Sequence, residues 1–182
     1  MKRVVWIMCL VMILCGCSGS GNALDEALAL RSAVLQAKEI AFSVDLTADY
    51  GDMTYSFSMD CIGDSDGNVT FTVTAPETIS GITGKLSTDG GSLTFDDTVL
   101  AIPMLTDDQI TPISAPWILL RTLRSGCITS CADGRMTIDD SYADDALTLD
   151  IQLDQDGMPA AADIYWKNRR ILAITVTSFA LS

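Results

Sequence analysis

The sequence predicts an α+β fold: a curved antiparallel sheet of about ten strands, an incomplete, half-open β-barrel, with two covering helices. Two segments carry apolar residues at helical spacing, and most of the remaining chain alternates apolar and polar residues. Glycine, aspartate and asparagine turns separate the alternating segments, which is typical of an antiparallel meander. Because the apolar face of such a sheet is larger than two short helices can cover, we expect the sheet to curl around them.

The first predicted helix covers residues 23–40, and Asn22 can cap its start. Its apolar stripe recurs at helical spacing and consists of Ala23, Ala27, Leu30, Val34 and Ala37. After Ile40 the period of the apolar residues changes to two, which predicts strands. In chain order these strands cover residues 42–50, 53–61, 69–75, 84–87, 92–96 and 99–102.

The second predicted helix covers residues 114–126, where Ser114 is the expected N-cap and Gly126 follows the last turn. Strands then resume at residues 135–139, 147–153, 160–167 and 171–181. We find no internal repeat and no second domain. The predicted organisation is a signal peptide at 1–16, a flexible lipidated linker at 17–22, and one domain at 23–182.

The N-terminus predicts export and a lipid anchor. Lys2 and Arg3 precede an apolar run at 4–15, which is too short for a membrane span of about 20 residues and is typical of a secretory signal. The sequence LCGC at 14–17 resembles a bacterial lipobox. That resemblance implies that Cys17 receives a diacylglyceryl group and becomes the first mature residue. The expected location is extracytoplasmic, on the cell membrane or on the outer membrane of a cell with two membranes.

The charge of the chain limits its partners. The 182 residues include 11 basic and 24 acidic ones, a formal charge of −13. Removing the signal peptide with Lys2 and Arg3 leaves nine basic residues and a charge of −15. Such a protein repels nucleic acid and anionic headgroups, so we expect no nucleic-acid partner and membrane contact through the anchor. A basic protein partner is left open.

Three cysteines follow Cys17, so at most one internal disulfide can form. A bond between Cys127 and Cys131 is the candidate, since an extracytoplasmic address permits it. In a continuous strand the two residues would be about 13 Å apart, which is too far, whereas a helical turn or a tight loop could bring them together. The alternative is a set of free thiols, buried in the core.

The sequence does not predict an enzyme. It has no histidine, which excludes Ser–His and Cys–His pairs, and it has no glycine-rich phosphate loop. Two acidic stretches, 64–68 and 154–157, hint at calcium. The first would need a closing glutamate where Ala75 stands, and hairpin turns explain both better. We therefore predict no catalytic residue, no metal site and no cofactor other than the covalent lipid.

The order of these features resembles the LolA/LolB-like lipoprotein carrier superfamily, in particular small lipid-anchored members. The resemblance rests on the lipobox, the long first helix, the segment VTAPETISGITGKLSTDGGSLTFDD at 73–97, and a helix that opens with SAPW at 114–117. It implies a half-barrel whose apolar cavity binds acyl chains of lipids or lipoproteins. Shuttling between two membranes, the task of the outer-membrane receptor, has no counterpart in a cell with a single membrane.

The predicted function is therefore non-enzymatic binding of an apolar ligand, such as a fatty acid, a lipid or the acyl chains of a lipoprotein. The candidate cavity residues are Phe42, Val44, Leu46, Tyr55, Phe57, Phe71, Trp117 and Leu120. The same residues could instead form a fully packed core. In that case the domain would be a scaffold that docks an envelope enzyme or another lipoprotein through its surface.

Overall fold

A computed structural model describes residues 20–96, 98–102, 105–106, 109–140 and 147–182. The helices are α2 Ser20–Gln36 and α3 Ala115–Ser125, with 3-10 turns η1 Glu77–Ile79 and η2 Pro112–Ser114. The strands are β1 Glu39–Asp49, β2 Thr54–Asp64, β3 Val69–Ala75, β4 Thr83–Ser87, β5 Gly90–Phe95, β6 Thr98–Ile102, β7 Leu105–Thr106, β8 Gln109–Ile110, β9 Cys127–Ala132, β10 Arg135–Asp140, β11 Leu147–Leu153, β12 Pro159–Trp166 and β13 Arg169–Leu181.

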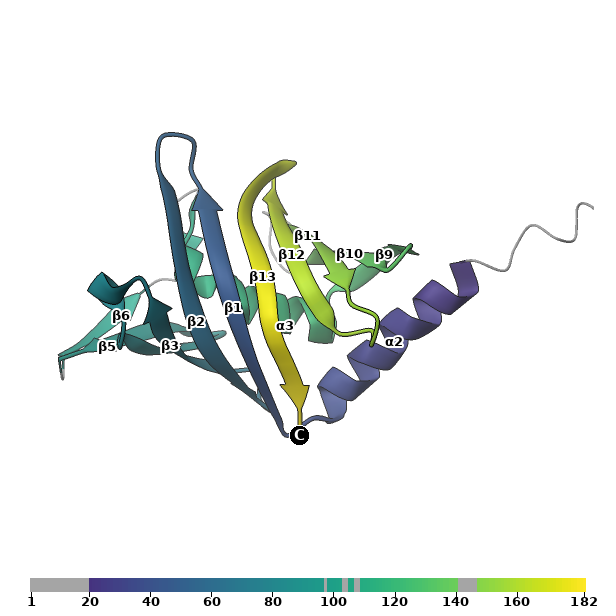
Figure 1. Cartoon of the computed structure of the whole chain (residues 1–182), viewed down its shortest axis with the longest axis horizontal. Coiled ribbons are helices and arrows are strands. Elements are labelled where there is room, and N and C mark those ends of the chain that lie inside the picture. The colour runs from purple at the N-terminus through teal and green to yellow at the C-terminus, as the bar shows by residue number, and fades with distance from the viewer. Residues whose placement is uncertain (1–19, 97, 103–104, 107–108, 141–146) are drawn as a thin grey trace, which may run out of the picture.

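One antiparallel sheet of 11 strands organises the described residues, in the order β6-β5-β4-β3-β2-β1-β13-β12-β11-β10-β9, and β7 pairs with β8 apart from it. Strands adjacent in the sheet are adjacent in the chain except at the centre, where β1 pairs with β13 (Figure 1). The sheet therefore consists of two meanders joined by their first and last strands. It is curved and stays open, which confirms the predicted half-barrel.

The inner face of the sheet carries the core, because period-two alternation places every second side chain on it. On β1 the exposed and buried positions alternate along the whole strand. Its inner residues are at most 2% exposed and are Ile40, Phe42, Val44, Leu46 and Ala48. β13 continues this face through the pairs Ile40–Leu181, Phe42–Phe179 and Leu46–Ile174.

Helix α2 buries most of the predicted stripe against β9 and α3: Ala27, Leu30 and Val34 are at most 3% exposed. Ala23 is only half-buried, and Ala37, at 8%, follows the last residue of the helix. Its bounds differ from the prediction, since it begins at Ser20 and ends at Gln36. Residue 22 therefore lies inside the helix and does not cap it. The helix ends early because residues 39–40 join the alternation of β1, where Ile40 pairs with Gly63 and Leu181.

Helix α3 lies against the inner face, behind the sheet in Figure 1, and eight of its 11 residues are buried. Leu120 packs directly on Gly63 of β2, where an added Cβ would lie 2.3 Å from Leu120 Cδ2. Ser114 holds the predicted N-cap position, but its hydroxyl donates to the Thr111 carbonyl at 2.6 Å and caps no helical N–H. Gly126 follows the last turn as predicted.

Polar contacts fix α3 to the turn at 63–68 and to β10. Trp117 Nε1 donates to the Gly67 carbonyl at 3.1 Å. Arg124 donates to the carbonyls of Asp64 and Ser65 at 2.8 and 3.0 Å. Arg121 forms an ion pair with Asp140, which is 3% exposed, and its guanidinium carbon lies 4.5 Å from the centroid of the Trp117 ring. These contacts hold α3 in one position on the sheet.

Candidate functional site

The inner face extends beyond α3 at the hairpin that joins β1 to β2. An 11-residue helix is about 16 Å long, whereas an 11-residue strand is about 36 Å long. Helix α3 leaves part of the inner face of β2 uncovered, and the β1–β2 hairpin projects from the molecule (Figure 1). Tyr55, an inner residue that pairs with Ala48, is 45% exposed there.

A cavity of about 670 Å³ lies at this end of the sheet. Its walls come from the β1–β2 hairpin, from η1 after β3, and from the segment around η2 before α3. The lining is mostly apolar and consists of Tyr50, Asp52, Met53, Tyr55, Ser56, Phe57, Pro76, Ile79, Ile110, Thr111, Pro112 and Ile113. Hydrophobic and aromatic walls with few polar groups are typical of small-molecule sites.

Two tyrosines organise the hairpin wall. The Tyr50 hydroxyl donates to the Ile110 carbonyl and so joins the hairpin to the segment before α3. The rings of Tyr50 and Tyr55 pack edge to face, with centroids 6.3 Å apart. The Tyr55 hydroxyl donates to Met53 Sδ at 3.3 Å. Burial, reinforced by Tyr55, raises the pKa of Tyr50 to about 12, so this hydroxyl stays protonated at neutral pH.

The structure brings two of the eight candidate residues, Tyr55 and Phe57, into this cavity. The other six are at most 5% exposed and lie in the core: Phe42, Val44, Leu46, Phe71, Trp117 and Leu120. Most residues that line this cavity were not among the candidates predicted from the sequence. Tyr50 and Met53 belong to the alternating pattern and could have been included, but the residues at 110–113 follow no period that marks them.

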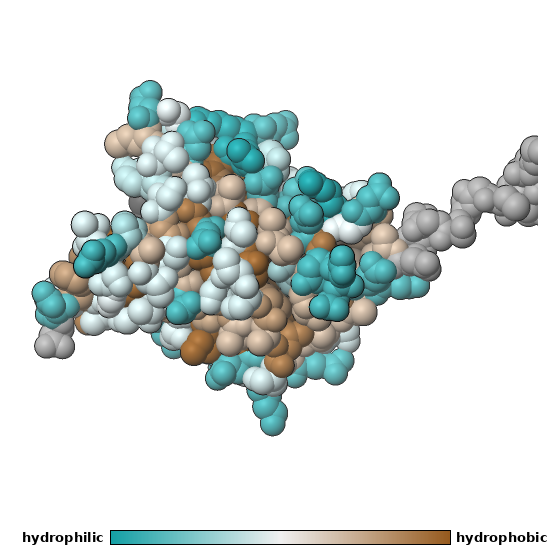
Figure 2. All heavy atoms as spheres, in the orientation of Figure 1, coloured by the Kyte–Doolittle hydropathy of each residue, from teal (hydrophilic) through white to brown (hydrophobic). Residues whose placement is uncertain are grey.

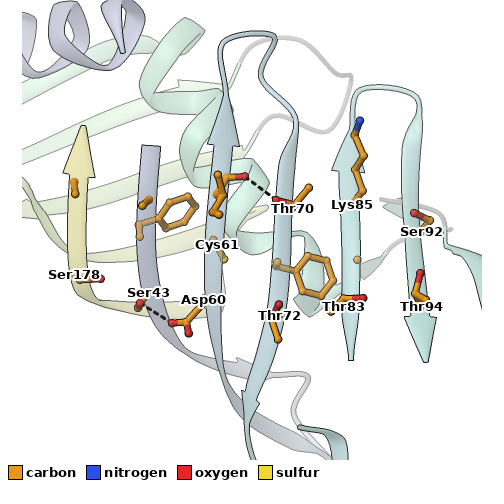
Figure 3. A pocket seen from close by; sticks show the side chains of 16 residues that line it. Ser43, Asp60, Cys61, Thr70, Thr72, Thr83, Lys85, Ser92, Thr94 and Ser178 are labelled. Carbon is orange, nitrogen blue, oxygen red and sulfur yellow. Dashed lines mark hydrogen bonds between the residues drawn. The ribbon is translucent and has the colours of Figure 1, made fainter. Parts of the chain in front are cut away.

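A second hollow of about 730 Å³ lies on the outer face of the sheet, across β13, β1, β2, β3, β4 and β5. Figure 3 shows its hydroxyl-bearing side chains together with Asp60 and Lys85, and Ser43 donates to Asp60 at 2.7 Å. Atoms of Phe42 and Phe71 also border it, although both side chains belong to the core. In Figure 2 much of the outer face is weakly polar, with scattered apolar patches. Serine and threonine walls suit an acyl chain poorly.

The three cysteines after Cys17 are free thiols. Cys61 is buried on the inner face of β2, and burial with the nearby Asp60 raises its pKa. Cys127 and Cys131 both lie on β9, where Cys127 is exposed and Cys131 is half-buried. Cys17, the predicted lipidation site, lies outside the described residues.

Two further findings concern the described residues. The residues that the structure describes contain no group of three or more Cys, Asp or Glu side chains that could hold a metal ion. None of the helices that the structure describes is long and apolar enough to cross a membrane.

No protein-family model matches the chain, and no curated protein matches it. Solved structures similar to it include a LolA superfamily protein from Nitrosomonas europaea, at 8% identity and a TM-score of 0.46, covering 86% of this chain and 93% of that one. The lipoprotein LppX from Mycobacterium tuberculosis is similar at 15% identity and a TM-score of 0.41, and the match covers 87% of this chain and 95% of LppX. LprF from Mycobacterium bovis is similar at 13% identity and a TM-score of 0.41, and the match covers 89% of this chain and 94% of LprF.

The TM-scores of these three structures lie below 0.5. Their identities and TM-scores are too low to transfer a ligand or a residue role. The cavity of this chain is therefore the basis for its proposed function.

Proposed function

We propose that the protein is a lipid-anchored, extracytoplasmic, non-enzymatic binding protein, and that an apolar ligand such as an acyl chain occupies the cavity at the β1–β2 hairpin. The observation that carries the proposal is the combination of volume and lining. About 670 Å³ enclosed mainly by tyrosine, phenylalanine, isoleucine, methionine and proline side chains falls within the range of small-molecule sites, about 300–1,000 Å³.

The physical driving force is the removal of methylene groups from water. Each buried CH2 contributes about 0.8 kcal/mol, so a chain of several methylenes against this wall gains enough to bind reversibly. The polar end of the ligand would lie at the rim, where Asp52 is exposed and Thr111 is half-buried. The anchor on Cys17, predicted from the lipobox, would keep the cavity near the membrane that supplies such ligands.

Native mass spectrometry tests the proposal, on a chain from Ser18 onward that is secreted without the lipobox, and organic extraction afterwards identifies any bound lipid. We expect a stoichiometric lipid or fatty-acid adduct, either co-purified or taken up from added palmitate. The decisive variant is Tyr55→Asp, which places a charge on the cavity wall and should abolish the adduct. The matched control is Ile62→Asp on the same strand, on the outer face and similarly exposed (48% against 45%).

The outcomes separate the alternatives. Loss of the adduct in Tyr55→Asp alone supports the cavity at the β1–β2 hairpin. Loss in Ile62→Asp alone would instead place the ligand in the second hollow, on the outer face of the sheet. An apo mass for the unchanged protein, with no uptake of palmitate or phospholipid, contradicts ligand binding.

The second candidate function is a scaffold for protein partners, and one observation favours it. Strand β6 is an edge of the described sheet and exposes apolar side chains, with Val99 at 67% and Leu100 at 61%. Phe95 on β5, at 52%, lies beside it. An edge strand of this kind can accept an extended, apolar polypeptide segment as an added strand. Cross-linking from β6 would identify such a partner if the cavity proves empty.

A further inference from the structure

Helix α2 has a second apolar stripe that the domain does not cover. Leu24, Leu28 and Leu35 are 44%, 47% and 55% exposed, whereas the opposite stripe of the helix is buried. At 100° per residue these three leucines fall within an arc of about 40°. Ordinary exposed leucines are scattered singly, so an aligned set on one helix face calls for an occupant.

The stripe is accompanied by cations. Arg31 lies in line with the leucines, and its Nε donates to the Leu123 carbonyl at 2.9 Å. Leu35 borders a hollow of about 310 Å³ together with Asp66, Arg121 and Arg124. Arg121 is paired with Asp140. Arg31 and Arg124 donate to main-chain carbonyls, and these uncharged partners do not neutralise their positive charges.

The position of the predicted anchor selects the occupant. Only two residues separate Cys17 from Ser20, the first residue of α2, and a span from Cys17 to Ser20 reaches at most about 11 Å. The N-terminal end of α2 projects beyond the sheet, away from the rest of the domain (Figure 1). With Cys17 acylated, this end of the helix cannot leave the bilayer surface.

We infer that the Leu24, Leu28 and Leu35 face of α2 is a membrane-contacting surface, which lies in the headgroup region of a bilayer while the lipid on Cys17 holds it there. The inference rests on the anchor of the proposed function but not on the cavity. Interfacial helices bury an apolar face at the acyl boundary and hold cations at the headgroups. Arg124 supplies such a cation beside Leu35 in a strongly acidic protein, whereas Arg31 is partly buried. Asp25 lies about 100° from Leu24 and about 60° from Leu28, at the edge of the stripe.

The test uses the full, lipidated chain in vesicles of phosphatidylcholine with phosphatidylglycerol, with Cys127 and Cys131 changed to serine. A bimane label at Leu28→Cys should lose most of its fluorescence to headgroup nitroxide lipids. The matched control is Ala29→Cys, which is also exposed but about 100° around the helix, and it should lose little. Adding Leu24→Asp should restore much of the fluorescence at position 28.

Equal quenching at positions 28 and 29 would overturn the inference. Quenching at position 28 that Leu24→Asp does not change would also overturn it. Neither result would contradict the lipid anchor on Cys17. A chain that does not float with the vesicles lacks the anchor, and this result overturns the membrane contact as well. Neither result bears on palmitate uptake by the secreted domain, so the cavity proposal is judged separately.

Discussion

Replacing Gly63 by alanine tests how closely α3 is packed on the sheet. The added methyl would lie 2.3 Å from Leu120 Cδ2 and 3.7 Å from Ile40 Cβ. Carbon atoms in contact prefer about 3.5–4.0 Å, so Leu120 or the helix has to move by more than about 1 Å. Leu120 is 1% exposed, and it has no adjacent solvent into which to move.

The expected loss of stability follows from two opposing effects. Overpacking a filled core costs about 1–3 kcal/mol, while replacing glycine in a strand gains about 0.5–1 kcal/mol. We expect a net loss of about 0–2.5 kcal/mol, measured by urea unfolding, or at most about 10 °C in Tm for a domain of this size. Palmitate uptake should be unchanged, because Gly63 lies six residues, or about 20 Å, along β2 from Phe57.

A double-mutant cycle gives the sharper readout. Leu120→Ala alone should cost about 2–5 kcal/mol because it leaves a cavity. In the Gly63→Ala background the new methyl fills part of that space, so the same change should cost less by at least about 1 kcal/mol. Additivity within about 0.5 kcal/mol would refute the direct packing of Leu120 on Gly63.

Three further predictions concern thiols, pH and the ion pair. Under native conditions at pH 8, iodoacetamide should modify the exposed Cys127 and spare Cys61, because burial raises the pKa of Cys61. Mass spectrometry should show no disulfide at Cys127, and a disulfide-linked peptide would contradict the assignment of free thiols. The pKa of Tyr50 is raised to about 12, so its contribution to stability is complete below pH 10 and is lost as pH rises toward 12. Tyr50→Phe should weaken this alkaline loss in urea titrations, and an unchanged alkaline limb would refute the assignment. Asp140→Asn removes the negative charge that faces Arg121 and should cost about 2–4 kcal/mol in urea unfolding, whereas a loss below about 1 kcal/mol would indicate a solvated pair.

The strands and helices of the core could be predicted because their patterns are local. The predicted bounds of the strand at 69–75 coincide with β3, and α3 differs from its prediction by one residue at each end. The strand β9 was missed because it is an edge strand, with no fully buried position to give a clear alternation. The first helix was predicted to end four residues too late because its apolar spacing continues into Ile40, which belongs to β1 by pairing.

The cavity was harder to predict than the fold because it depends on where α3 ends relative to the sheet. Phe42 and Tyr55 carry the same sequence signal, an aromatic residue on the inner face of an alternating strand. One is 2% exposed and the other 45%, since α3 and its neighbours cover the first and leave the second open. The opposite wall comes from residues around η2, which reach the hairpin through the bond from Tyr50 to the Ile110 carbonyl.

The contacts of α3 also indicate where an apolar ligand can enter at low cost. Opening the space between α3 and the sheet would break the Arg121–Asp140 pair and separate Trp117 from the Gly67 carbonyl. It would also expose core side chains such as Leu120, each of which contributes about 1.5–3 kcal/mol when buried. The hairpin cavity requires none of this, because its walls are already apart. A carrier built on this fold would therefore bind at the end of the half-barrel and keep its centre packed.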